Sequence, residues 1–85
     1  MASSEEEKGK RWLVDLVRSI DPEIEVVIPV SASSDLYLIA LNKRKGKKFI
    51  QISEDDMLDL ASEEGVREEI DEKIREAVSE LQAQL

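Results

Sequence analysis

The chain has 85 residues, with 20 acidic and 12 basic side chains and a formal net charge of −8. It contains no cysteine and no histidine, which excludes a disulfide framework, a thiolate metal site, a cysteine nucleophile and the usual general base near neutral pH. One small domain without these groups is a poor candidate for an enzyme, so we expect no catalytic residue and no cofactor.

The N-terminal helix is predicted from an apolar stripe that ends before Pro22. Glutamates in the first turn oppose the helix dipole and favour a start after Ser4, whereas Gly9 weakens that turn and favours a start near Lys8. The spacing of three to four residues predicts an amphipathic helix with Trp12 as an anchor in the core. The stripe consists of Trp12, Leu13, Leu16, Val17 and Ile20.

Three short strands are predicted after this helix. The segment Ile24 to Val30 alternates, and Pro29 favours an edge position because proline cannot donate to a strand ladder. The segment Leu36 to Leu41 is apolar on both faces, which is typical of a central strand covered by helices or by a partner. Gly46 is expected to supply the positive φ of a hairpin loop, and Lys48 to Ile52 follows as the third strand. Short connections predict an antiparallel meander with the second strand in the centre.

The spacing of apolar residues in 54–85 predicts either one kinked helix or two helices. Ser53 has the character of a helix N-cap, and Gly65 interrupts the pattern about one-third of the way along. Ser62 is a candidate cap for the part after the break, which predicts a long amphipathic C-terminal helix. The predicted fold class is therefore α+β with the order α-β-β-β-α-α, a three-stranded antiparallel meander packed by helices. Residues 1–5 are predicted to be a disordered tail, and residues 6–85 a single domain.

Apolar side chains that the helices leave uncovered predict a protein interface. Tyr37, Ile39 and Leu41 share one face of the second strand, and the residues between them share the other. If helices cover only one face, the other face is an apolar patch; if helices cover both faces, both belong to the core. The end of the C-terminal helix can also overhang the sheet, and an isologous homodimer is the expected arrangement. The interface candidates are Tyr37, Ile39, Leu41, Val78, Leu81 and Leu85.

The connection between the second and third strands is cationic, and nucleic-acid phosphates are one possible partner for it. The alternative is a solvated turn whose lysines keep another strand from adding to the sheet edge. The acidic remainder of the chain favours this alternative. Nucleic acid is therefore ranked below protein as a partner. The candidate residues are Lys43, Arg44, Lys45, Lys47 and Lys48.

Asp55 and Asp59 are one helical turn apart, a spacing that suits a shared hard cation such as Mg²⁺. The alternative is acidic residues at a helix N-terminus that face water, and because this arrangement is common we predict no metal site.

The sequence also indicates where the protein works and what it does. No apolar run approaches the length of a membrane span, and the acidic first residues carry no apolar signal region, which predicts a cytoplasmic protein without membrane contact. The predicted function is that of a small acidic, non-enzymatic protein-interaction module, adaptor-like or chaperone-like and self-associating. Nucleic-acid contact through residues 43–48 is the alternative.

Overall fold

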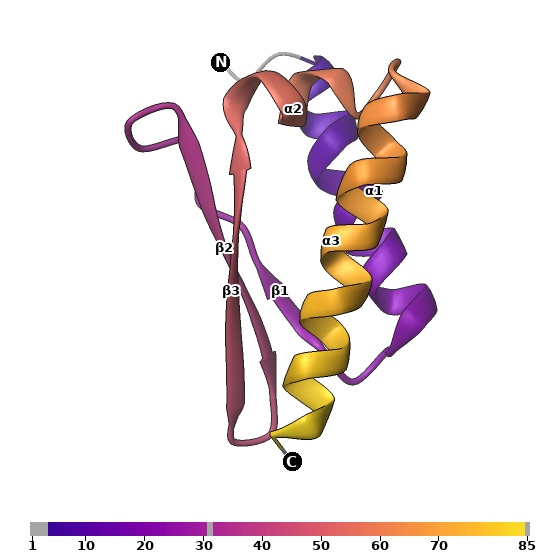
Figure 1. Cartoon of the computed structure of the whole chain (residues 1–85). Coiled ribbons are helices and arrows are strands. Elements are labelled where there is room, and N and C mark those ends of the chain that lie inside the picture. Colours follow the sequence, from indigo (N-terminus) through magenta and orange to yellow (C-terminus); the bar gives the residue numbers. More distant parts are fainter. Residues whose placement is uncertain (1–3, 31, 85) are drawn as a thin grey trace.

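Three helices and three strands follow one another in the predicted order within residues 4–30 and 32–84, which the computed structural model describes. The strands form one antiparallel sheet of order β1-β2-β3, which confirms the predicted α+β fold and the central place of the second strand. In Figure 1, α1 and α3 lie side by side on one side of the sheet, and α2 crosses at the end where α1 begins. The elements are α1 (Ser4–Ile20), β1 (Glu25–Val27), β2 (Leu36–Lys43), β3 (Gly46–Ser53), α2 (Glu54–Asp59) and α3 (Glu64–Ala83).

The core lies between the sheet and the helices because each element turns one apolar face inward. The inward apolar residues of β2 are at most 1% exposed, and those of β3 at most 7%. Helix α3 contributes apolar residues three or four positions apart, as its sequence predicts. The inward residues of β2 and α3 are Tyr37, Ile39 and Leu41, and Ile70, Ile74, Ala77, Val78 and Leu81.

Strands β2 and β3 pair along their whole length in a single register. Lys43 pairs with Gly46, which shortens the connection to the two residues Arg44 and Lys45. The positive φ that the loop needs is at Arg44 (φ 53°) and not at Gly46, so the prediction for Gly46 was wrong. The reason is that both strands extend further toward the turn than their apolar residues indicate, which makes Gly46 the first residue of a strand.

Strand β1 is shorter than the predicted segment Ile24 to Val30. It covers Glu25–Val27, and its last residue pairs with Ala40 of β2. Pro29 has no N–H to donate, which explains why the ladder does not continue through it. The chain then enters β2 through a tight turn in which Ser34 (φ 52°) and Asp35 (φ 64°) both adopt the left-handed conformation.

Helix α1 begins at Ser4, ahead of both the predicted start near Lys8 and the predicted domain boundary at residue 6. Residues 1–3 of the predicted tail lie outside the described residues. Gly9 is buried inside the helix, and a Cβ built on it would overlap the carbonyl oxygen of Met57 in α2. The glycine that weakens the helix locally therefore lies where the backbone of α2 leaves no room for a side chain on α1.

Residues 54–83 form two helices and not one kinked helix. The predicted cap of the first one is confirmed, because the Ser53 hydroxyl accepts a hydrogen bond from the Asp56 N–H at 3.1 Å. The predicted cap at Ser62 was wrong. Its backbone N–H donates to the Asp59 carbonyl at 3.0 Å and completes the turn after α2, while α3 has Glu63 at its N-cap position without a side-chain cap.

Replacing Gly9 with alanine is expected to lower the free energy of unfolding by about 1–3 kcal/mol, because the added methyl group overlaps the α2 backbone. Gly65 provides the matched control, since a Cβ there meets nothing within 4 Å and the helix gains propensity. Gly65→Ala is expected to leave stability unchanged or to raise it by up to about 1 kcal/mol. Urea unfolding of both variants measures the difference, and equal effects would contradict the close contact.

Candidate docking surface

The sheet has one face that no described helix covers, on the side opposite α1 and α3 (Figure 1). We call it the open face. Strand register arranges its side chains in rows across the three strands, because residues paired across a ladder point to the same side. One row is Val27–Ala40–Phe49, and the next is Glu25–Asn42–Lys47. The open face consists of Glu25, Val27, Leu36, Leu38, Ala40, Asn42, Lys47, Phe49 and Gln51.

The open face is apolar at its centre. Leu38 and Phe49 are each 52% exposed, and Val27 is 45% exposed. Leu36 extends the apolar surface toward the start of β2 at 40% exposure. Large apolar side chains that share one sheet face and remain about half exposed form the kind of patch that marks an interaction site.

The interface candidates chosen from the sequence lie on the opposite, covered face. Tyr37, Ile39 and Leu41 are within the core and are not accessible to a partner. The residues between them on β2 lie on the open face instead. The cause is the register, which pairs Ile39 with Ile50 and Tyr37 with Ile52. The face that is apolar on both long strands is the one the helices cover.

The C-terminal interface candidates are also placed by this arrangement. Val78 and Leu81 are at most 1% exposed and pack in the core, so α3 does not present them to a partner. Leu85 lies outside the described residues.

Two lysines lie on the β3 side of the molecule, Lys47 within the open face and Lys73 at the edge of the sheet. The Lys47 ammonium lies 5.7 Å from the centre of the Phe49 ring, so its side chain runs over that ring. The Lys73 ammonium of α3 donates to the Gln51 carbonyl on the outer edge of β3 at 3.0 Å. A hollow of about 440 Å³ runs along this edge, lined by Leu38 and Phe49 from the open face and by residues of α3.

Most cations of the predicted nucleic-acid site are paired with carboxylates. Lys43 contacts Asp21 at 2.5 Å and Glu23 at 3.3 Å, and Arg44 contacts Glu23 at 3.7 Å. Lys48 contacts Glu80 of α3 at 2.5 Å. Within the described part of the chain, Lys45 and Lys47 form no ion pair, which leaves two of the five cations unpaired for phosphates.

The Lys43–Asp21 pair belongs to a cluster that sequence reasoning did not find. Asp21 is 6% exposed and follows the last residue of α1. Its carboxylate accepts from Lys43, from the Gln82 amide at 3.1 Å and from the Glu23 N–H at 3.0 Å. The hydrogen bond from Lys43, followed by those from Gln82 and Glu23, lowers the pKa of Asp21 to about 2. The same contact with Asp21 raises the pKa of Lys43.

Tyr37 has a second polar contact at the other end of α1. Its hydroxyl donates to the Glu6 carboxylate, and Lys10 lies over its ring at 5.2 Å from the centre. Burial, followed by the contact with Glu6, raises the pKa of Tyr37 to about 12. The hydrogen bond from Tyr37 lowers the pKa of Glu6. These contacts fix α1 against the start of β2.

The predicted metal candidates do not gather a complete ligand set. Asp55 and Asp59 lie on α2, where Asp55 is exposed and Asp59 is partly exposed. No group of three or more metal-ligating side chains comes together among the described residues.

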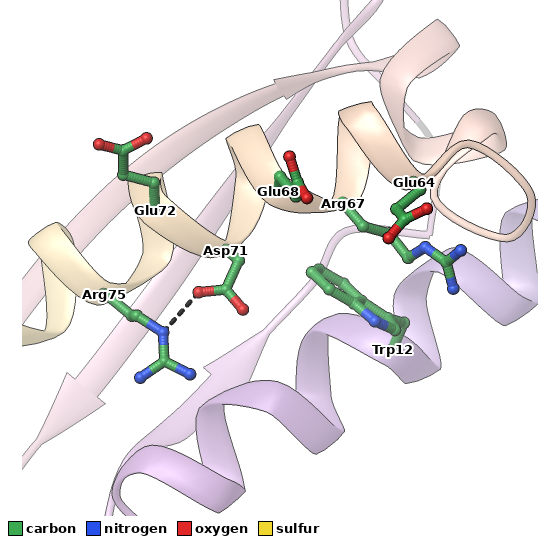
Figure 2. Close-up of a pocket in the computed structure, with 7 residues that line it drawn as sticks. All are labelled: Trp12, Glu64, Arg67, Glu68, Asp71, Glu72 and Arg75. Atoms are coloured by element: carbon green, nitrogen blue, oxygen red, sulfur yellow. Dashed lines mark hydrogen bonds and ion pairs between the residues drawn. The ribbon is translucent and has the colours of Figure 1, made fainter.

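A groove of about 600 Å³ lies between α1 and α3, over the half-buried Trp12 (Figure 2). The α3 side chains around it carry both charges, and Arg75 pairs with Asp71 at 2.5 Å within the helix. Trp12 packs against the core, as predicted for an anchor. The groove is lined by Trp12, Glu64, Arg67, Glu68, Asp71, Glu72 and Arg75.

The described helices include none that is long and apolar enough to cross a membrane. Comparison with profiles of protein families, with curated proteins and with solved structures found no match to this chain.

The chain has a single tyrosine, so its ionisation can be followed by ultraviolet titration of tyrosinate absorbance. We expect a midpoint near pH 12 in the folded chain and near 10.0 in denaturant. Because the folded state holds the proton more tightly, the stabilising contribution is complete below pH 10.0 and is lost as the pH rises through about 12. A folded-state midpoint equal to that in denaturant would contradict the burial of Tyr37 and its contact with Glu6.

Replacing Lys43 with alanine is expected to destabilise the fold and to raise the pKa of Asp21 from about 2 toward 3.8, because the buried carboxylate loses its ammonium partner. The contribution of Asp21 to stability is complete above pH 3.8 and is lost as the pH falls through about 2. Carboxyl ¹³C shifts measured against pH, with urea unfolding, test both statements. Lys45→Ala at the exposed neighbouring turn residue is the control and should change stability by less than about 0.5 kcal/mol.

Proposed function

We propose that this chain is a non-enzymatic protein-interaction module, adaptor-like or chaperone-like, that binds a protein partner on the open face. The observation that carries the proposal is that the exposed large apolar side chains gather on the open face. Of the five large apolar residues exposed in the described chain, four lie on the open face and one, Val30, lies in the segment after β1. The four are Val27, Leu36, Leu38 and Phe49.

The chemistry of this face suits a protein better than a charged or small ligand. Its central residues offer flat apolar surface, with charged groups only in the row Glu25–Asn42–Lys47 near one end. An apolar centre with polar groups at its border is the usual composition of a protein interface. Aromatic residues are enriched among those that contribute most to such interfaces, which points to Phe49 as the anchor.

Self-association and a cytoplasmic location are parts of the same proposal. The ion pairs at Lys43, Arg44 and Lys48 leave no specific observation in favour of nucleic-acid contact, which is therefore not proposed as a second function.

Site-specific photo-cross-linking in cells tests the proposal. A photoreactive residue in place of Leu38, which is half exposed on the open face, is expected to give protein adducts. The same residue in place of Glu72, exposed on α3, is the matched control and is expected to give few. Adding Phe49→Glu to the position-38 probe should abolish the adducts while the melting temperature changes little, because Phe49 is 52% exposed. Equal adducts at both positions, or none at position 38, would overturn the proposal.

A further inference from the structure

We infer that the partner of the open face is a second copy of this chain, packed face to face about a two-fold axis that runs parallel to the strands over β2. This inference rests on the proposed function, because it names the partner of the same surface. It is carried by the order of charged and apolar residues across the sheet, which is self-complementary in this one arrangement.

The self-complementarity follows from the strand order β1-β2-β3. A two-fold axis parallel to the strands places β1 of each copy over β3 of the other and keeps every row opposite its own counterpart. In the row Glu25–Asn42–Lys47, the glutamate on β1 then faces the lysine on β3 of the second copy, twice. Two equivalent ion pairs, each between Glu25 of one copy and Lys47 of the other, therefore form across the interface.

The apolar residues match in the same arrangement. In the row Val27–Ala40–Phe49, each phenylalanine faces a valine of the other copy, and the small Ala40 residues face each other on the axis. Leu38 of β2 lies next to this row on the axis and meets its counterpart. Aligned sheets pack about 10 Å apart, a gap that Phe, Leu and the long charged side chains fill.

The other face-to-face arrangement is less favourable. A two-fold axis across the strands reverses the order of the rows, so that the charged row of one copy lies over the end of β2 that carries Leu36 in the other. Glu25 and Lys47 would then lose water without gaining a partner, which is costly for charged groups.

The charge of the whole chain also favours association through this face. Each copy carries a formal net charge of −8, so two copies repel one another. Face-to-face packing leaves α1 and α3 on the two outer sides of the dimer, because both helices lie on the covered face (Figure 1). The exposed glutamates of α3 then lie on the outer sides of the dimer, away from the interface.

The expected affinity is low because the surface is small. Three strands of up to eight residues give a footprint of roughly 26 by 14 Å, which is less than the ~800 Å² that each partner buries in a standard interface. We therefore expect a dimer that forms between ~10 µM and ~1 mM, the range of weak complexes.

Sedimentation equilibrium of the full chain over this concentration range is the first test, with two charge-reversal variants. E25K carries two lysines in the row and K47E two glutamates, so each alone should dimerise at least ~tenfold more weakly than the parent chain. An equimolar mixture should dimerise again, because every lysine of one variant then faces a glutamate of the other. Changes within one chain cannot produce this rescue. Both residues are exposed, and thermal unfolding checks that each variant is folded.

A second measurement reads the contact directly. In a mixture of ¹³C-labelled and unlabelled chains, isotope-filtered NMR should detect Val27 methyl groups near the Phe49 ring of the other copy. Within one chain the two residues stand on β1 and β3 with Ala40 between them, about 10 Å apart, so an intermolecular signal is distinctive.

The outcomes separate the inference from the proposed function. A parent chain that stays monomeric throughout the range, variants that dimerise like the parent, or a mixture without rescue would each overturn the two-fold packing. Adducts of another protein at position 38 in cells, together with a monomeric purified chain, would overturn the inference and the self-association in the proposal, and would leave the protein-binding function of the open face standing. The absence of any adduct would remove both.

Discussion

The arrangement of the elements depends on one buried carboxylate. Asp21 follows the last residue of α1, and its two oxygens accept hydrogen bonds from Lys43 at the end of β2, Gln82 in the last turn of α3 and the backbone N–H of Glu23. Because a buried charge is stable only when it is paired and hydrogen-bonded, these segments have to meet at one point. This contact brings the C-terminal ends of both long helices to the β2–β3 turn, at the lower end of the molecule in Figure 1.

At the opposite end of the molecule, different contacts fix the elements. There, the missing side chain of Gly9 lets α1 approach the backbone of α2, and Glu6 accepts a hydrogen bond from Tyr37. With α1 fixed at both ends and α3 packed along β3, both long helices lie on one face of the sheet. The other face keeps its apolar residues exposed, so the candidate docking surface is a consequence of how the helices are attached.

The element order was predictable from periodicity, because the strands and α3 follow their two- and 3.6-residue repeats. The choice of the covered face was not, since β2 is apolar on both sides. The register with β3 decides which face is covered, because Ile50 pairs with Ile39 and Ile52 pairs with Tyr37. The isoleucines of the third strand therefore carry the signal in the sequence. The Asp21 cluster was beyond sequence reasoning because Lys43 and Gln82 lie 22 and 61 residues away from it. Helix propensity alone predicts only a weakened turn at Gly9, whereas a tertiary contact with α2 determines its role.

The contact between Lys73 and the Gln51 carbonyl also bears on which assemblies this fold can form. The outer edge of β3 is a strand edge to which a further strand could be added, and repeated addition there would be open-ended. The ammonium group of α3 occupies one of the acceptors on that edge and obstructs such growth. The packing proposed for the open face is closed, because two copies would use up each other's surface. The contact at the edge of β3 therefore disfavours fibril growth there, whereas the proposed dimer is a finite particle.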